Sequence, residues 1–407
     1  MAAEVGSRVF KQSQASSEFC SLKEGKMRRM RIVMVALAVA FFVQSAQAQW
    51  TTAKRLTWTS GWSEWPALAI DSGDKLHAVW ADNTTGHYEV YYKKSTDLGS
   101  SWTTTRRLTW ASAYFGSVAI AVGTTDHIHL VWQDTPPGNG EIYYKKSTDG
   151  GSSWTASKRL TWNSGSSEDP AIAVDSQGAL HVVWEDYTPG ESEIYHKKSM
   201  DGGVTWTASQ RLTWTPGSSF HPAVAAHWGG LYVVWEEYSG GSDEVYFRKS
   251  TDGGVIWSAS QKVTWTSGNS ASPALGVDFF GYLHLAWVDD TPGDIEVYYS
   301  KSTNGGASWA ATRRLTWASG YSDTPALAVD SSGNPYVVWE DDTSGKEEIY
   351  CRKSMDGGTT WAASQRLTWN SGYSFGPAIA IDSPGFPHVL WWDDTPGNFE
   401  IYYKGGK

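Results

Sequence analysis

Two acidic positions recur seven times at fixed distances from a tryptophan, and carboxylates are side chains that bind cations and cleave glycosidic bonds. One stands two residues after the tryptophan and the other nine residues after it. A pair that is the same in every repeat is better explained by turns that need capping than by one active site. We therefore expect both sets to be structural. They are Asp82, Asp134, Asp186, Glu237, Asp289, Asp341 and Asp393, and Glu89, Glu141, Glu193, Glu244, Glu296, Glu348 and Glu400.

A histidine three residues before the same tryptophan is the next candidate, because imidazole is a common metal ligand and base. Tyr232 and Tyr336 replace it in two of the repeats, and tyrosine is a poor substitute for a metal ligand. The histidines also lie at least one repeat apart, without the short ligand spacing of metal sites. We predict no metal and no cofactor, and histidines with satisfied hydrogen bonds on strands: His77, His129, His181, His284 and His388.

A third group of residues differs from repeat to repeat, in the short segment ahead of a proline that Val118 replaces once. Aromatic and acidic residues dominate these segments. An aromatic ring can cover the C–H face of a sugar while polar groups bond its hydroxyls. With Trp392, which also stands outside the repeat pattern, they form our candidate ligand-binding set: Trp62, Glu64, Trp65, Tyr114, Phe115, Glu168, Asp169, Phe220, His221, Tyr321, Asp323, Tyr373 and Phe375.

These residues are carried by a repeat of about 52 residues, which three tryptophan series mark. Each series has seven members, so four of the 25 tryptophans stand outside the repeat. Of these four, Trp62 and Trp65 belong to the first repeat and Trp392 to the seventh, whereas Trp228 lies elsewhere. One series ends the motif Leu/Val-Thr-Trp, at Trp58, Trp110, Trp162, Trp214, Trp265, Trp317 and Trp369.

Each repeat reads as four short strands. Segments such as 171–175, 180–184, 193–195 and 158–162 are β-branched, aromatic or alternating, and glycine-rich turns separate them. No helical period occurs after residue 48. Seven such units predict an all-β fold, a seven-bladed β-propeller with four antiparallel strands per blade. An open superhelix is the alternative.

The two ends of the repeat region favour a closed ring. The last repeat stops after its third strand at 402–407, while residues 49–58 form a fourth strand with no blade before it. Pairing the two fragments completes the last blade and removes the open edges of a linear array. Closure also makes the first and seventh repeats neighbours, so Trp62, Trp65 and Trp392 are expected in one pocket with Glu64, Tyr373 and Phe375. The alternatives are that these aromatics reinforce the closure or fill the axial channel.

A family resemblance rests on the segments Ser147-Thr-Asp-Gly-Gly-Ser-Ser-Trp154 and Ser199-Met-Asp-Gly-Gly-Val-Thr-Trp206, with two more at 250–257 and 354–361. The segment 95–102 has Leu98 in place of the first glycine, and 302–309 has Asn304 in place of the aspartate. The chain resembles the BNR/Asp-box propellers of the sialidase superfamily over residues 49–407. The resemblance implies that each box is a structural turn on the face opposite the active site, at Asp97, Asp149, Asp201, Asp252, Asn304 and Asp356.

The resemblance does not extend to sialidase chemistry. Sialidases hold the substrate carboxylate with three arginines, carry an F-R-I-P motif and have six blades, whereas this chain has no such motif and no arginine in the variable segments. We leave the catalytic residues unassigned. We predict a non-catalytic module that recognises a glycan or a surface in an axial funnel opposite the Asp-boxes. The alternatives are a sialidase-like or other glycoside hydrolase, with carboxylates from Glu64, Glu168, Asp169 and Asp323, or an extracellular protein-interaction scaffold. A polysaccharide lyase would need a histidine or tyrosine base, for which His221 and Tyr114 are candidates.

The net charge and the N-terminal segment indicate which partners to exclude and where the protein is located. The formal net charge is −10, and it becomes −14 without residues 1–48, which hold seven Lys and Arg and three Asp and Glu. This excess argues against nucleic acid as a partner. Residues 27–48 read as a signal peptide cleaved after Ala48, and residues 1–26 as an upstream start-site artefact. The apolar run 32–43 is too short to cross a bilayer. We expect a secreted or periplasmic monomer, with no disulfide framework from Cys20 and Cys351.

Overall fold

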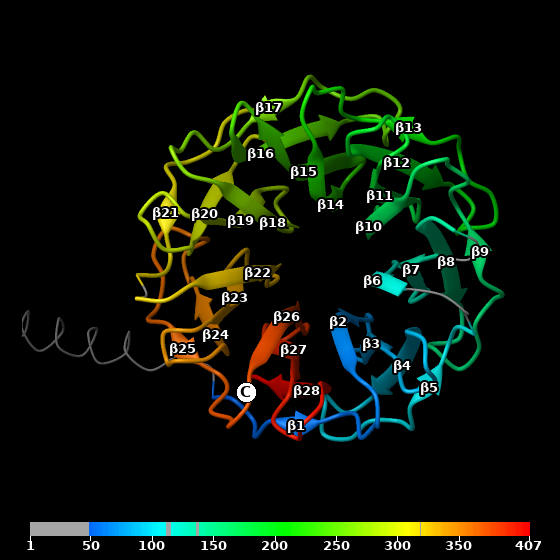
Figure 1. The fold of residues 1–407 in the computed structure, drawn as a ribbon, viewed down its shortest axis with the longest axis vertical. Helices are drawn as coiled ribbons and strands as arrows, with labels where there is room; N and C mark the ends of the chain where they lie inside the picture. Colours follow the sequence, from blue (N-terminus) through cyan, green and yellow to red (C-terminus); the bar gives the residue numbers. More distant parts are fainter. Residues whose placement is uncertain (1–48, 111–114, 136–137, 318) are drawn as a thin grey trace, which may run out of the picture. The chain divides into compact units, whose positions relative to one another are not determined.

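The structure is a computed structural model that describes residues 49–110, 115–135, 138–317 and 319–407. The predicted segments 1–26 and 27–48, and Tyr114, lie outside these residues. Within them, residues from Trp50 to Lys407 form one compact unit, in which the strands build seven four-stranded antiparallel sheets. The sheets are arranged as blades around a central axis (Figure 1). The predicted seven-bladed β-propeller is confirmed.

Each blade contributes one strand to each of four concentric positions, and we number the blades 1 to 7 from their innermost strands. The innermost strands are β2 (Ser63–Ile70), β6 (Phe115–Val122), β10 (Ser167–Val174), β14 (Ser219–His227), β18 (Ser270–Val277), β22 (Ser322–Val329) and β26 (Ser374–Ile381). The second strands are β3 (Leu76–Asp82), β7 (Ile128–Asp134), β11 (Leu180–Asp186), β15 (Gly230–Ser239), β19 (Leu283–Asp289), β23 (Pro335–Asp341) and β27 (Pro387–Asp393). The third strands are β4 (Glu89–Ser95), β8 (Glu141–Ser147), β12 (Glu193–Ser199), β16 (Ser242–Ser250), β20 (Glu296–Ser302), β24 (Glu348–Lys353) and β28 (Glu400–Gly405). The outermost strands are β5 (Arg106–Arg107), β9 (Lys158–Arg159), β13 (Gln210–Arg211), β17 (Gln261–Lys262), β21 (Arg313–Arg314), β25 (Gln365–Arg366) and, for blade 7, β1 (Lys54–Arg55).

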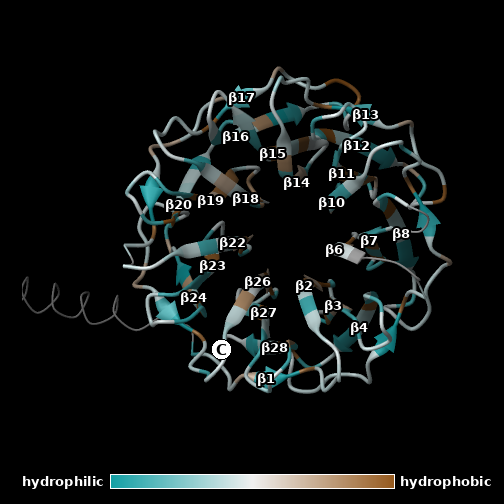
Figure 2. Cartoon of the chain, in the orientation of Figure 1, coloured by the Kyte–Doolittle hydropathy of each residue, from teal (hydrophilic) through white to brown (hydrophobic). Residues whose placement is uncertain are grey.

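The hydrophobic core lies between neighbouring blades. The second strands are buried along almost their whole length, and each contains one fully buried tryptophan, such as Trp80 in β3. That indole stacks on a tyrosine of the third strand, with 6.2 Å between the ring centroids of Trp80 and Tyr91. One core cluster joins Val79 of blade 1 to Leu130 of blade 2. The outermost strands are short and hydrophilic (Figure 2).

The outermost strands are shorter than predicted, for a reason that concerns the Leu/Val-Thr-Trp motif. The segment predicted as 158–162 pairs with β8 only at Lys158 and Arg159. Leu160 N continues the ladder to Ile142 O, and then the Thr161 side-chain hydroxyl, instead of the backbone, accepts from Ile142 N at 2.8 Å. The backbone therefore leaves the sheet and Trp162 points to solvent. The same holds in every blade, so that seven residues, which we call the rim tryptophans, are 62–78% exposed: Trp58, Trp110, Trp162, Trp214, Trp265, Trp317 and Trp369.

The N-terminal strand closes the ring, as predicted. β1 pairs with β28 in the register Lys54 to Tyr403 and Arg55 to Tyr402. Leu56 is 2% exposed in a core cluster shared with blade 1. Trp50 forms a bridge with Gly406 and donates its indole N–H to Gln365 of blade 6 at 2.8 Å.

The Asp-box turns join third and fourth strands at the end of the blades that we call the lower face. In the box of blade 2, Asp149 Oδ1 accepts from Ser153 N at 2.7 Å and from Ser147 Oγ at 2.8 Å. Trp154 then packs edge-on against Tyr92 of blade 1, with 5.3 Å between centroids. The opposite, upper face therefore carries the turns between second and third strands and the links from each blade to the next. In the described part of the chain, no helix has the length and apolar character needed to cross a membrane.

Candidate functional site

Each innermost strand begins on the upper face and has a β-bulge near its start. In β10 the pairing with β11 shifts between Glu168 and Ala171, and the bulge residue Asp169 has a φ of 44°. A left-handed φ costs a non-glycine residue about 1 kcal/mol, and a bulge directs a side chain away from its regular position. The six residues with positive φ at this position immediately precede a proline: Trp65, Asp169, His221, Ser272, Thr324 and Gly376.

In three of these bulges, the backbone N–H donates a hydrogen bond to a glutamate of the preceding blade. Glu185 Oε2 accepts from His221 N at 3.1 Å, and Glu236 Oε2 accepts from Ser272 N at 3.2 Å. Glu340 makes the same bond to Gly376 N at 2.7 Å. Each glutamate directly follows the buried tryptophan of its second strand.

The sequence analysis singled out this position only at Trp392, although the signal was present in every repeat. It varies among repeats while the tryptophan before it stays constant and the residue after it stays acidic. The seven residues are Ala81, Gln133, Glu185, Glu236, Val288, Glu340 and Trp392.

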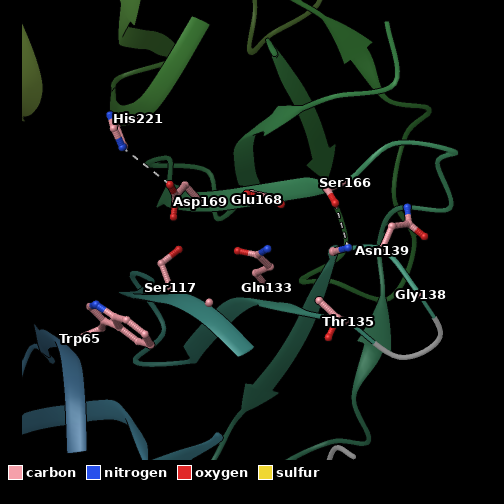
Figure 3. Close-up of a pocket in the computed structure, with 12 residues that line it drawn as sticks. Trp65, Ser117, Gln133, Thr135, Gly138, Asn139, Ser166, Glu168, Asp169 and His221 are labelled. Atoms are coloured by element: carbon pink, nitrogen blue, oxygen red, sulfur yellow. Dashed lines mark hydrogen bonds and ion pairs between the residues drawn. The ribbon is translucent and has the colours of Figure 1, made fainter. Parts of the chain in front are cut away.

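A depression of about 530 Å³ lies among blades 1 to 4 on this face, and we call it the funnel depression. Figure 3 shows Trp65 on one side of it and Glu168, Asp169 and His221 on the other, with Ser117 and Gln133 pointing into the space between. Its lining residues are Trp65, Gly116, Ser117, Gln133, Thr135, Gly138, Asn139, Gly140, Ser166, Glu168, Asp169 and His221.

The funnel depression exists because blade 2 has small residues where other blades have large ones. Gly116 takes the position of Glu64, Glu168 or Phe375. A Cβ there would lie 2.1 Å from Gln133 Oε1, so the Gln133 amide occupies the space above the glycine. Gly140 N donates to Ser166 Oγ at 3.2 Å and ties the wall of blade 2 to blade 3.

The electrostatics of the funnel depression are acidic. None of its twelve lining residues is lysine or arginine. His221 Nδ1 lies 3.1 Å from Glu236 Oε2, and its Nε2 lies 4.0 Å from Asp169 Oδ2. The hydrogen bond to Glu236, together with the neighbouring carboxylates, raises the pKa of the half-exposed imidazole.

Two glutamates beside His221 have raised pKa values. Burial, and then the charge of Asp169, raises the pKa of Glu185 to about 7. Burial also raises the pKa of Glu168. Carboxyl groups with raised pKa values often occur at functional sites, and burial raises those of Glu64 and Glu340 elsewhere on the upper face as well.

The structure divides the residues that were expected in one pocket. Trp392 packs on Phe375 at 5.1 Å and on Phe399 at 4.6 Å between ring centroids. Trp62 reaches the same Phe399 at 5.8 Å, and Tyr373 stacks on Phe375 at 6.1 Å. These five rings, which we call the seam cluster, join blades 7 and 1.

Trp65 and Glu64 have another partner, Tyr88. Trp65 packs on Tyr88, with 5.4 Å between centroids, and the Tyr88 hydroxyl donates to Glu64. Tyr88 and Phe399 were not predicted, because both come from turns between second and third strands and not from the variable segments.

The other predicted residues are spread around the funnel. Phe220 lies 6.3 Å from His221 between ring centroids. Tyr321 is 55% exposed and its backbone N–H donates to Asp342, while Asp323 accepts from the backbone N–H of Thr324. The backbone of Phe115 begins β6. Phe220, Tyr321 and Asp323 are not among the residues that line the funnel depression.

The recurring carboxylates and histidines form hydrogen bonds and ion pairs within their own blades. Asp82 accepts from Ser63 Oγ and from Thr84 N, which caps the turn as expected. Glu89 instead binds Arg107 on the outermost strand, at 2.6 Å.

His77 lies between Tyr92 OH and Asp71, at 2.8 and 3.3 Å. Among the residues that the structure describes, no three His, Cys, Asp or Glu side chains converge as metal ligands.

Fold and site together define a β-propeller with Asp-box turns on one face and a funnel on the other. Residues 140–389, more than half of the chain, match the BNR repeat-like domain, and the protein belongs to that family. The family resemblance drawn from the Asp-boxes is thereby confirmed. No significant match occurs among the curated proteins.

Solved structures resemble this chain at low sequence identity. A polysaccharide lyase described as an ulvan lyase is 11% identical, with a TM-score of 0.65 over 86% of this chain and 95% of that chain. A protein of unknown function from Dyadobacter fermentans is 12% identical, with a TM-score of 0.56 over 87% of this chain and 99% of that chain. A sialidase from Streptococcus pneumoniae is 12% identical, with a TM-score of 0.46 over 88% of this chain and 70% of that chain.

Proposed function

We propose that this protein is a carbohydrate-recognition module and that its ligand binds in the funnel depression. The observation that carries the proposal is the convergence of one indole, Trp65, with amide, hydroxyl and carboxylate groups around a single hollow. An indole face suits the C–H face of a sugar, Gln133 can donate to and accept from its hydroxyls, and Asn139, whose amide N–H groups bind Asn163 O and Gly165 O, can accept through Oδ1. The bulge supports this role because it sets Trp65 in an unusual backbone conformation at the wall of the hollow.

The charge of the funnel depression indicates the class of sugar. An acidic wall without lysine or arginine repels uronate and sulfate groups and favours neutral or amino sugars. The ulvan lyase of the same fold is bound to a -[GlcA(1-4)Rha3S]- saccharide, which is acidic. We therefore infer a ligand class for this funnel different from the one in that complex.

Titration calorimetry of the full chain with neutral and amino-sugar oligosaccharides tests the proposal. Trp65→Ala should weaken binding by about 1 to 3 kcal/mol, which is roughly 5- to 150-fold. Trp62→Ala is the matched control, since Trp62 is an exposed tryptophan of the same blade that lies in the seam cluster. Equal losses in both variants, or no binding of any oligosaccharide by the parent, would remove the funnel depression as the site.

A glycoside hydrolase is the second candidate, and the raised pKa of Glu168 favours it. Glu168 and Asp169 both line the funnel depression, and glycosidases use two carboxyl groups, one of which acts as an acid with a raised pKa. Glu168→Gln separates the two functions. The parent would be tested against a panel of glycosides. If it hydrolyses one of them, and the variant still binds this glycoside but no longer hydrolyses it, the glycoside hydrolase becomes the favoured function.

Export belongs to the same proposal, because a glycan outside the cell is the partner that it requires. The basic, apolar and small-residue pattern of residues 27–48 supports it. N-terminal sequencing of the protein recovered from the producing cells tests this part. A first residue of Gln49 is expected, and a retained 27–48 segment contradicts it.

A further inference from the structure

The rim tryptophans have cationic side chains over their rings, yet most of each indole is exposed. Each is 62–78% exposed, although a single exposed aromatic needs no explanation on a protein surface. Here the same residue is exposed at the same point of all seven repeats. The threonine hydrogen bond described above turns each indole outward, so exposure is built into the repeat.

Each exposed indole has at least one lysine or arginine side chain close to its ring. Arg55 Cζ and Lys93 Nζ both lie 5.6 Å from the ring centroid of Trp58. Arg55 Nη2 binds Glu400 at 2.7 Å and its Nε donates to Thr57 O, while Lys93 Nζ donates to Leu56 O. The cations are therefore held in place before any ligand arrives.

The arginine keeps one donor group for a ligand. Nε and Nη2 of Arg55 are engaged, and about a quarter of the side chain, 24%, remains exposed. Nη1 is thus the group that can meet an anion beside the indole.

The charge balance at the rim is opposite to that of the funnel depression. Six rim sites combine a tryptophan with two cations within 6 Å of its ring, against one buried glutamate. The seventh, Trp265, has only Lys262, at 4.8 Å, because Ser300 takes the place of the second cation. The site of Trp265, between blades 4 and 5, therefore provides a natural weak site for comparison.

We propose that the rim is a second carbohydrate-binding surface, for acidic polysaccharides. A sugar ring covers the indole face, and its carboxylate or sulfate pairs with Nη1 of the adjacent arginine. One such site is weak, but seven on a rigid ring raise the effective concentration for a long chain, so that affinity grows by about 10² to 10⁴ without new contacts. The rim site is independent of the proposed function of the funnel depression.

Dextran and dextran sulfate of equal length form a matched pair of probes, because they share a backbone and differ only in charge. The full chain, immobilised at low density for biolayer interferometry, should bind long dextran sulfate at least tenfold more tightly than dextran. Short sulfated oligosaccharides that reach one site should bind at least a hundredfold more weakly than the long polymer. Since the chain carries an excess of acidic residues, bulk charge does not explain binding to a polyanion.

Substitution series identify the rim as the binding surface. Trp162→Ala should lower affinity for long dextran sulfate a few-fold, and the triple variant with Trp214→Ala and Trp369→Ala about a hundredfold, with unchanged melting temperature. Trp265→Ala, at the site with one cation, should have the smallest effect, and Trp65→Ala in the funnel should have none. Parent-like binding by the triple variant, equal binding of dextran and dextran sulfate, or loss through Trp65→Ala would overturn the proposal.

Discussion

The turns on the lower face and the bulges on the upper face come from the same repeat, but they use their polar groups in opposite ways. In the Asp-box of blade 2, Asp149 accepts from Ser147 and Ser153, so its carboxylate is satisfied within the turn. On the upper face, Glu185 is buried beside Asp169 and Glu168 and supports a bulge of the next blade. Positions that stay identical thus build the scaffold, and positions that diverge build the candidate site.

The pKa values of the two faces follow the same division. Hydrogen bonds from Ser153 and Ser147 lower the pKa of Asp149 to about 2. Burial and a neighbouring charge raise the pKa of Glu185 to about 7. Asp149 is therefore stabilised as an anion, whereas burial disfavours the anion of Glu185, and the stabilities that these two groups contribute should respond to pH in opposite directions.

The largest expected effect comes from opening the ring on which both faces depend. Deletion of residues 50–58 removes β1, the Leu56 side chain and the Arg55–Glu400 pair from blade 7. The deletion variant should lose its cooperative thermal transition in calorimetry. Leu56→Ala is the graded counterpart and should cost about 2 to 5 kcal/mol. A deletion variant that melts as the parent does would contradict closure by β1.

The second prediction concerns the upper face. The pKa of Glu185 is raised above its unfolded value of 4.5, so its folded form takes up a proton and gains stability at low pH. That gain is lost as pH rises through about 7. Glu185→Gln should flatten this decline, and its stability relative to the parent should rise by roughly 2 kcal/mol between pH 5 and 8. Urea denaturation across this range measures it, and a constant difference at all pH values would speak against a buried Glu185.

The third prediction concerns the lower face. Asp149→Ala should lower the midpoint of thermal unfolding at pH 7 by about 1 to 3 °C, because turn amides lose their acceptor. The lowered pKa means that this stabilisation is present above pH 3.8 and is lost as pH falls through about 2, so the variant and the parent should converge there.

Asp149→Asn is the matched control for the lower face. Asn304 already occupies the equivalent position in blade 5 and accepts from Ser308 N at 2.9 Å. The asparagine variant should retain most of the parent's midpoint at pH 7, and sugar binding should be unchanged in both variants. A loss of sugar binding at unchanged midpoint would assign the lower face a role in recognition.

The smallest effect is expected in the Asp-box of blade 1, where Leu98 replaces the first glycine of the other boxes. Leu98 has a φ of 54° at a position where five other boxes have glycine with similar φ. Leu98→Gly relieves about 1 kcal/mol of backbone strain, and the greater freedom of glycine in the unfolded chain offsets part of it. The net change should be a gain of less than about 1 kcal/mol in the free energy of unfolding, measured with urea. A clear loss would indicate that the Leu98 side chain contributes packing.

The architecture could be predicted because it rests on identical repeats with local turn chemistry. Three tryptophan series with seven members each predict seven blades. The incomplete repeats at 49–58 and 402–407 predict the closure that β1 and β28 make. The end of the outermost strand could not be predicted from its alternating pattern. Thr161 competes with its own backbone for Ile142 N, and this contact depends on the neighbouring strand.

The candidate site could be predicted only in part, because it depends on contacts between blades. The variable segments include Trp65, Glu168, Asp169 and His221, which the structure brings together around one hollow. Whether Trp65 joins Trp392 depends on Tyr88 and Phe399, which come from other turns. Gly116 and Gln133 were missed because a hollow is the absence of a side chain, and only the packed structure displays it.

A crystal structure of the full chain with its tightest-binding neutral or amino-sugar oligosaccharide tests most directly the claim that divergent positions form the ligand site. The account predicts a sugar ring on the indole of Trp65, with hydroxyls bonded to Gln133 and Asn139 in the funnel depression. A sugar bound instead at the Asp-box turns or on the seam cluster, with the funnel depression empty, would contradict it.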